Sequence, residues 1–573
     1  ILNLLNLLTM NNLISQSVKI PHRSGHYLGH HFQFTAGIGE AIPVLCHPLI
    51  PGSRVSLKTL LSAQLAPLAS DCYLRTSMRL EAFAVPLRFL YGGYEDWVTR
   101  NPTYNFTGSA TYSNRLGVRL PRLSFTGSAF KTYCKAGSLA DYLGIRIDNT
   151  DLSYIGDNDR IYVNIFPFLA YQYLWDTWYR RADIQQPFFR KPADNTTSSN
   201  LLSPRALPYL YKSGANADDF SVYDISATAV TSLLQTWQRN FPIDYFTSAM
   251  VSPQLGPEES VSITPDSADG HFTIQALRSA NALQVWRERL GLSGPRFSDW
   301  LRAQYGTDLS DSNGRRPMYL GSASVEFYSK GVDQSFNDLG SGGINTNNPF
   351  PSVGARYGQP LCNGESNLID DFTCDEPCYL MVIATAVPKV MYSSGVERYM
   401  LHYTKDGCEG DLANPILQSI GNQEIKLAEI SGVGVMEPNS STPTNASIND
   451  VFGYQQRYAE YMYRNDRVSG LFRDGESLEA FVAQRYLGTP AGGQTPGVGP
   501  QTISNSFLRI PKNYLDQVSA TSQNVSLFGV MCDMYFDFSV SQPLYDSSIP
   551  SLVNPAEEHG RDIVVMRGGK RIL

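Results

Sequence analysis

Residues 524–540 read NVSLFGVMCDMYFDFSV, and this stretch decides the fold class. Apolar and polar side chains alternate along it, which is the pattern of a strand with one buried face. The apolar side of the alternation consists of Phe528, Val530, Cys532, Met534, Phe536, Phe538 and Val540. The stretch therefore predicts a long, half-buried β-strand near the end of the chain.

Two further stretches predict long strands. Residues 71–85 (DCYLRTSMRLEAFAV) alternate in the same way, with Leu80 on the apolar side and Glu81 on the polar side. Residues 378–387 (CYLMVIATAV) are apolar on both faces and stop at Pro388, which predicts a fully buried strand. We expect an all-β fold, an antiparallel barrel or sandwich with large insertions between its strands.

Helical periodicity marks three segments inside the insertions. Residues 166–182 repeat aromatic side chains at Phe168, Tyr171, Trp175 and Trp178. Residues 274–290 repeat apolar ones at Leu277, Ala280, Leu283, Trp286 and Leu290. After a Gly-Leu-Ser-Gly-Pro break, a third helix is predicted around Trp300.

Loops are predicted where Gly, Pro, Ser and Asn are dense. These ranges are 101–126, 183–228, 331–375 and 488–500. Loops of this length usually form functional surface or pack against partner chains.

The composition favours a protein whose surface is covered by other chains. Of 573 residues, 42% are hydrophobic, while only 17% are charged, against roughly 25% in an average domain. Aromatic enrichment and charge depletion characterise interface cores, although a large aromatic core looks similar. The net charge of −7 excludes nucleic-acid binding by bulk electrostatics, so contact with a polyanion requires a local basic surface.

The eight cysteines form no CxxC pair, and we interpret them as thiols of a chain made in a reducing cytoplasm, with disulfides left open. The N-terminal stretch ILNLLNLLTMNN has no basic region and no cleavage site, so no signal peptide is expected. We expect this stretch either to dock as a short amphipathic arm on a neighbouring chain or to fray.

No pattern predicts catalysis, a cofactor or a metal site. His22, His26 and His30 recur every fourth residue, but the intervening glycines favour an extended arm over a metal-binding helix. Cys374 and Cys378 are four residues apart, with no zinc-site partner at a suitable spacing. P-loop, HExxH and GxSxG motifs are absent from the sequence.

Basic residues supply the candidate DNA contacts. In the tail at 559–573 these are Arg561, Arg567, Lys570 and Arg571. Further basic pairs are Arg180 with Arg181, Arg315 with Arg316, and Arg464 with Arg467. Arginine also anchors protein interfaces through bidentate pairing, so subunit or intrachain contacts are the main alternative, favoured for the pairs and evenly balanced for the tail.

Several sequence blocks resemble one known family when taken together and in order. The strongest is VFGYQQRYAEYMYRNDRVSGLF at 451–472, followed by YQYLWDTWYR at 171–180 and ALRSANALQVWRERLGLSGPRFSDWLRAQYG at 276–306. Weaker blocks extend the match over about residues 50–545, among them PGSRVSL at 51–57 and SQPLYD at 541–546. The chain resembles the major capsid proteins of the Microviridae, small single-stranded DNA bacteriophages, on the gokushovirus branch.

The resemblance implies an eight-stranded antiparallel jelly-roll barrel, with the three predicted strands as its first, an inner and its last strand. Residues 51–546 are expected to form one capsid domain, with insertions at about 92–377 and 389–523, between an arm at 1–50 and a tail at 547–573. Helical insertions are expected to form most contacts between subunits. The chain is expected to be a structural protein of the virion, not an enzyme.

The resemblance also implies partners. Sixty copies would form an icosahedral shell, by way of pentamers, around a circular single-stranded DNA genome in the bacterial cytoplasm. A small basic DNA-binding protein, a vertex or pilot protein and a host receptor touched by outer loops complete the expected set.

Two departures from the family pattern indicate a divergent member. In gokushovirus capsid proteins a long insertion at this place forms protrusions at the threefold axes of the shell. The segment between Pro257 and Ile274 is short, so such a protrusion is expected to be absent or built from 101–160 or 331–375. The Arg-Pro of the family's buried strand reads Val387-Pro388.

Two other classes stay open on the residues alone. A secreted carbohydrate-active β-sandwich enzyme would be similarly rich in Tyr, Trp and Asn, but it requires a cleft with paired carboxylates and a signal peptide. A monomeric binding module requires exposed, charge-rich strands.

Overall fold

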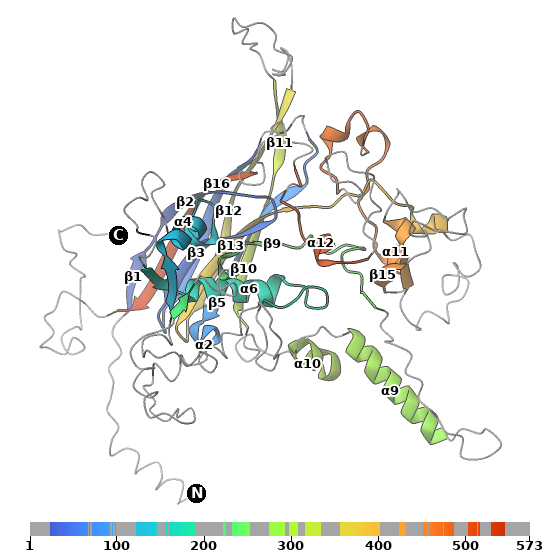
Figure 1. Ribbon diagram of the computed structural model, residues 1–573, viewed down its shortest axis with the longest axis horizontal. Coiled ribbons are helices and arrows are strands. Elements are labelled where there is room, and N and C mark those ends of the chain that lie inside the picture. The colour runs from blue at the N-terminus through green and yellow to red at the C-terminus, as the bar shows by residue number, and fades with distance from the viewer. Residues whose placement is uncertain are drawn as a thin grey trace, which may run out of the picture.

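Two antiparallel β-sheets form the centre of the molecule, as a computed structural model of the chain shows (Figure 1). The structure describes residues 23–66, 68, 72–91, 94, 98, 122–145, 156, 160–188, 222–224, 232–252, 274–292, 297–307, 316–333, 356–401, 423–430, 451–456, 458–473, 475–485, 502–512, 514–515 and 529–544. Within these residues, no helix has both the length and the apolar character needed to cross a membrane.

The first sheet has the strand order β1-β16-β4-β12-β11, and β2 also pairs with β16. Its strands are β1 (Arg23–Tyr27), β2 (His30–Ala36), β4 (Arg54–Leu65), β11 (Tyr328–Asp333), β12 (Arg356–Thr373) and β16 (Val530–Pro543). The last strand of the chain therefore lies inside this sheet, between the N-terminal strands and β4.

The second sheet has the order β10-β5-β13-β3-β9. Its strands are β3 (Glu40–Leu49), β5 (Thr76–Pro86), β9 (Trp237–Gln238), β10 (Met318–Glu326) and β13 (Cys378–Pro388). Every pairing in both sheets is antiparallel.

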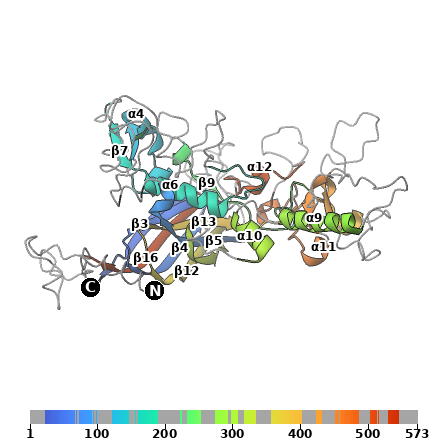
Figure 2. The ribbon, with the colours of Figure 1, turned by 90° about the horizontal axis from the view of Figure 1, so that it is seen from below.

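The main core lies between the two sheets (Figure 2). Leu57 and Phe536 of the first sheet belong to one buried cluster with Leu80 and Val382 of the second. Alternation places such side chains on the inner face of each strand, and removing this apolar surface from water stabilises the sandwich.

A second core covers the outer face of the second sheet. Met381 and Ile383 of β13 and Phe83 of β5 pack there with aromatic residues of α6 (Phe166–Leu174), such as Phe168. β13 thus contributes to a core on each side, which explains why its sequence is apolar on both faces.

The remaining elements belong to the insertions and connections. Two small sheets consist of β6 (Arg122–Thr126), β7 (Arg160–Asn164) and β8 (Val222–Asp224), and of β14 (Gln423–Lys426) and β15 (Val451–Gln455). Besides α6, the described residues include the α-helices α2 (Leu87–Leu90), α4 (Gly127–Tyr133), α5 (Leu139–Tyr142), α9 (Ile274–Leu292), α10 (Phe297–Tyr305), α11 (Ala459–Met462) and α12 (Asn505–Leu508). A π-helix covers Trp175–Tyr179, and 3₁₀ turns cover Ser232–Leu234, Arg398–Leu401, Leu427–Glu429, Gly470–Phe472 and Glu479–Phe481.

Three predicted strands and three predicted helices are confirmed, with changed limits or places. β5 begins at Thr76 rather than at residue 71, and β16 runs on to Pro543, while 524–528 lies outside the described residues. β5 is not the first strand, because β1 to β4 precede it. The helix predicted over 166–182 is α6 followed by the π-helix, and the backbone is extended at Arg180.

Two expectations about which residues form strands are wrong. The N-terminal arm expected at 1–50 supplies β1, β2 and β3 from residue 23 onward. The loop expected at 331–375 includes β12, which pairs with β4 and β11 and so belongs to the first sheet, not to an insertion. β12 is rich in Asn, Asp, Ser and Gly, which are uncommon in strands, so its sequence predicts a loop. It forms a strand because its backbone is hydrogen-bonded to two neighbouring strands.

A largely buried ion pair and a tyrosine of the π-helix together fix the α6 segment to the second sheet. Arg239, just after β9, donates from Nη1 to Glu81 Oε2 at 2.7 Å and from Nη2 to Oε1 at 2.8 Å. Tyr179 of the π-helix donates a further hydrogen bond to Glu81 Oε2. Burial raises the pKa of Glu81, but the hydrogen bonds and charge of Arg239 outweigh it, so this pKa lies below its usual value. The carboxylate is therefore held in its charged form.

This pair predicts a pH-dependent contribution to stability. A carboxylate with a lowered folded-state pKa stabilises the fold above its unfolded-state pKa, and the contribution is lost as the pH falls through the folded-state value. Glu81→Gln is expected to lower the free energy of unfolding at pH 7 by about 1.5–3 kcal/mol, because hydrogen bonds to a charged group are lost. Urea unfolding at several pH values measures it; a deficit that does not shrink below the usual glutamate pKa of 4.5 contradicts the assignment.

Candidate functional site

The helix α9 carries exposed apolar side chains. Leu277 is 64% exposed and Trp286 is 46% exposed, and Ile274, Leu283 and Val285 are exposed as well. α9 contacts α10, and both views place it away from the two sheets (Figures 1 and 2). Burying such side chains is favourable, so their exposure makes α9 a candidate surface for contact with another chain.

The apolar residues of α9 do not share one face. Leu277 and Trp286 are nine positions apart in the sequence, and nine positions correspond to about two and a half helical turns. The two side chains therefore emerge on opposite sides of the helix, unlike the single stripe that the sequence suggested. One flat contact cannot cover both.

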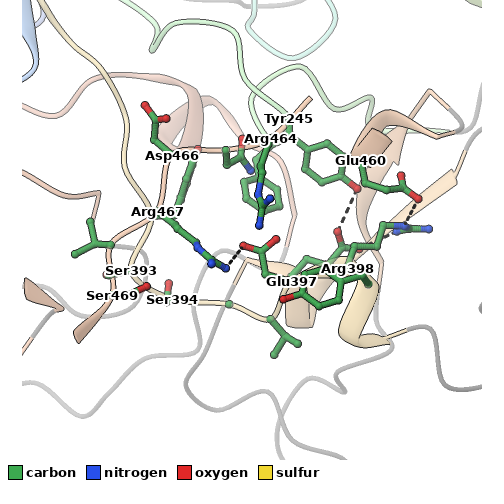
Figure 3. A pocket seen from close by; sticks show the side chains of 18 of the residues that line it. Tyr245, Ser393, Ser394, Glu397, Arg398, Glu460, Arg464, Asp466, Arg467 and Ser469 are labelled. Atoms are coloured by element: carbon green, nitrogen blue, oxygen red, sulfur yellow. Dashed lines mark hydrogen bonds and ion pairs between the residues drawn. The ribbon is translucent and has the colours of Figure 1, made fainter. Parts of the chain in front are cut away.

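A second group of exposed apolar residues lies at a pocket of about 510 Å³, which its three tyrosines line. Tyr399 and Met400 come from the 3₁₀ turn after β13, Tyr461 and Met462 from α11, and Tyr463 from the segment that follows. The pocket lies among the segments at 245–246, 392–399, 429 and 460–473 (Figure 3). It is thus built mainly in the insertion between β13 and β16, and Tyr245 and Phe246 come from the insertion between β5 and β10.

A buried polar network supports the pocket wall. Arg398 donates from Nη1 to Glu429 Oε1 at 2.9 Å, and its Nε lies 3.4 Å from Glu460 Oε1. Tyr245 donates to Glu429 Oε2 at 3.1 Å, and Gln423 donates to Glu460 Oε2 at 2.6 Å. Burial raises the pKa of Glu429, against the opposing charge of Arg398. These contacts hold the wall in one arrangement.

Two arginines on the pocket differ in their partners. Arg467 donates from Nη1 to Glu397 Oε1 at 3.0 Å. Arg464 is directed into the pocket in Figure 3 and makes no hydrogen bond or ion pair within the described part of the chain. A guanidinium group with tyrosines around it can bind a phosphate or a carboxylate and can stack on a planar group. Arg464 is therefore the group of this pocket that can pair with an anion, beside the carboxylates of Glu397, Glu429, Glu460 and Asp466.

The described residues contain no cluster of three or more His, Cys, Asp and Glu side chains that could hold a metal ion. His26 and His30 lie in β1 and β2, which are strands, so they do not form the face of a helix.

The predicted DNA-contacting pair Arg180 and Arg181 has partners within the chain. Arg180 Nε donates to Asp176 Oδ1 at 2.7 Å, and Arg181 Nη2 donates to Asp183 Oδ2 at 2.9 Å. Arg181 also donates to the backbone carbonyls of Thr247 and Ala249. DNA contact by this pair stays a prediction and competes with these interactions. The tail residues Arg561, Arg567, Lys570 and Arg571 lie outside the described residues.

The sequence indicated one wall of the pocket and missed the others. Arg464 and Arg467 were singled out, and the strongest family block, at 451–472, supplies the adjoining segment. Arg398, Glu429 and Tyr245 carried no local signal, because they come from three separate segments that only the fold brings together.

Two packed antiparallel sheets, long insertions and exposed apolar surface on an insertion helix are the features that a subunit of a larger assembly would need. A family model described as "Capsid protein (F protein)" matches residues 15–269 and 265–552. The chain belongs to this phage capsid protein family. The family is structural, in agreement with the expectation that the chain is not an enzyme.

Three capsid proteins VP1 are similar to the chain over nearly its whole length. That of Chlamydia phage 1 is 23% identical, covering 92% of this chain and 96% of the relative. That of Bdellovibrio phage phiMH2K is 20% identical, covering 89% and 92%, and that of Spiroplasma virus 4 is 19% identical, covering 95% and 96%. The resemblance to gokushovirus capsid proteins of the Microviridae is thereby confirmed, and the low identities agree with a divergent member.

Proposed function

We propose that the chain is the major capsid protein of a bacteriophage, and that sixty copies assemble by way of pentamers into an icosahedral shell around a circular single-stranded DNA genome. Assembly takes place in the bacterial cytoplasm. The order of strands in the two sheets carries this proposal.

Eight strands have the pairing of a jelly roll, a fold used by viral capsids. In chain order they are β2, β3, β4, β5, β10, β12, β13 and β16. The first pairs with the eighth, the second with the seventh, the third with the sixth and the fourth with the fifth. This is one long hairpin ribbon, and its rolling up explains why β16 also pairs with β4 and β13 with β5.

We place the capsid domain over β1 to β16, so that it begins before residue 51, and the tail at 547–573 follows it. The segments between β5 and β10 and between β13 and β16 are its two main insertions. α9, from the first of these, supports contacts between subunits, because its apolar side chains are exposed in the single chain.

The genome requires a basic inner surface, because the chain carries a net charge of −7. We propose the tail residues Arg561, Arg567, Lys570 and Arg571 as the main DNA contacts, assisted by a small basic DNA-binding protein. A vertex or pilot protein and a host receptor, touched by outer loops, complete the set of partners.

Assembly of the full-length chain, purified after co-expression with the phage's other structural proteins, tests the proposal. Size-exclusion chromatography followed by negative-stain imaging is expected to find pentamer-sized oligomers or closed shells when the phage's other structural proteins are co-expressed. A chain that stays monomeric under these conditions, or that hydrolyses glycans, contradicts it.

The tail gives a separate prediction. Replacing its four basic residues by alanine is expected to weaken binding to a single-stranded oligonucleotide. Each lost phosphate contact reduces the slope of log K against log salt by about 0.7, so four contacts reduce it by about 3. Fluorescence anisotropy over a NaCl series measures both quantities.

The matched control replaces by alanine four exposed basic residues outside the tail, Arg23, Lys58, Lys135 and Arg278. It is expected to leave the slope nearly unchanged. Equal slopes for the tail variant and the unmodified chain exclude the tail as the DNA contact.

A further inference from the structure

Two buried sulfur atoms lie in contact at the turn between β12 and β13. Cys374 Sγ and Cys378 Sγ are 3.0 Å apart, and both residues are almost completely buried. A disulfide bond has an S–S length of about 2.0 Å, so only a small movement of the two side chains separates this pair from a bond. Cys362, also buried, has its thiol directed to the carbonyl of Val325 instead.

The turn that carries the pair is a junction between the two sheets. β12 belongs to the first sheet and β13 to the second. The backbone of Cys374 exchanges hydrogen bonds with the β3–β4 turn, from its N–H to Ser53 O at 2.8 Å and from Gly52 N to its own O at 2.6 Å. Cys378 pairs with Leu49 of β3 and Pro86 of β5.

α2 contacts the same turn from another side. Leu87 N donates to Pro377 O at 3.0 Å, and Arg88 pairs with Glu376. These contacts fix the backbone on both sides of the two cysteines, so the fold keeps the two residues next to each other.

The two thiols are chemically unequal. The thiol of Cys374 is positioned to donate to Glu376 O at 2.8 Å, which leaves its sulfur to accept from Cys378. This hydrogen bond from Cys378 lowers the pKa of Cys374 and raises that of Cys378. Cys374 is therefore the thiol that loses its proton first, and a thiolate is the species that attacks a disulfide.

We propose that Cys374 and Cys378 are a disulfide-forming pair, kept as thiols in a reducing compartment and joined on exposure to a low-molecular-weight disulfide. This inference goes beyond capsid assembly and does not depend on it. The bond would fix the turn at which β12, β13, α2 and the β3–β4 turn meet.

The reaction balances as a thiol–disulfide exchange in two steps. When a local opening of the turn exposes Cys374, its thiolate attacks one sulfur of the oxidant, which forms a mixed disulfide and releases one thiolate. Cys378 then loses its proton and attacks the Cys374 sulfur, which forms the protein disulfide and releases a second thiolate. Two protein thiols are oxidised by two electrons, the oxidant is reduced to two thiols, and the released protons go to the two leaving thiolates or to solvent.

Oxidised glutathione added to the purified full-length chain is the probe. After acid quenching, N-ethylmaleimide in denaturant labels the thiols that remain, and peptide mapping locates them. The expected result is loss of both labels at Cys374 and Cys378, with a peptide in which the two are bridged, while Cys362 keeps its label. Dithiothreitol is expected to restore both labels.

Two variants sharpen the test. Cys374→Ser is expected to leave Cys378 labelled, and Cys362→Ser is expected to leave the bridge intact. Full labelling of Cys374 and Cys378 in the folded chain, under conditions that oxidise the urea-unfolded chain, overturns the proposal, as does a bridge to a different cysteine. Thiol labelling can also be measured on unassembled chains, so its result does not depend on the result of the assembly experiment.

Discussion

Trp286→Ser is expected to stop shells from forming while the single chain stays folded. Trp286 is about half exposed on α9, so its removal leaves no cavity in the chain's own core. A tryptophan buried at the centre of an interface contributes about 2 kcal/mol or more, so each contact weakens roughly thirtyfold. Identical copies repeat the same contact around a closed assembly, and the loss recurs at every position. Negative-stain imaging, under conditions in which the unmodified chain forms shells, measures the effect.

Arg278→Ser is the matched control, since it removes a long, exposed side chain from the same helix without removing apolar surface. We expect it to assemble. Circular dichroism and the unfolding midpoint should be the same for both variants and the unmodified chain. Normal shells from Trp286→Ser would exclude α9 as an essential contact.

Phe536→Ala is expected to lower the free energy of unfolding by about 3–5 kcal/mol. Phe536 is 0% exposed and lies in β16, facing the core between the two sheets. Its truncation removes apolar burial and leaves a cavity that the paired strands cannot close, because β16 is held on both sides. Domains have a stability of about 5–15 kcal/mol, so the loss is a large fraction of the total. The midpoint of urea unfolding, followed by tryptophan fluorescence, measures it.

Met531→Ala in the same strand is the control. Met531 is 40% exposed on the outer face of β16, and its truncation is expected to change the free energy of unfolding by no more than about 0.5 kcal/mol. Equal losses for the two variants would mean that the inner and outer faces of β16 are assigned wrongly.

The sequence predicted which face of a strand is buried better than it predicted the partners of that strand. Alternation is a local result of backbone geometry, so the inner positions of β16, among them Phe536 and Phe538, are confirmed. Pairing depends on contacts between distant segments. Residues 71–85 and 524–540 were expected to be the first and the last strand of one barrel, yet β5 follows four other strands and pairs with β10 and β13, while β16 lies in the opposite sheet.

Polarity explains what the sequence missed. Asn363 and Glu365 of β12 belong to a polar stretch that predicts a loop, but in the sheet their backbone groups bond to β4. The sequence did not predict the exposure of Trp286 in the single chain. An apolar helical repeat predicts burial, but it does not tell whether the covering residues belong to the same chain or to another. The pocket around Arg464 required segments that only the completed fold assembles.

The central place of β16 determines when the chain can fold. β4 ends at Leu65, and its partner β16 starts at Val530, so the ribosome needs roughly 20–90 s to supply the missing strand. During this time the edges of β2 and β4 that β16 will occupy carry unpaired backbone groups, which are prone to aggregation. The first sheet is therefore completed only at the end of translation, and a message cut short before β16 yields a chain that cannot close its sandwich.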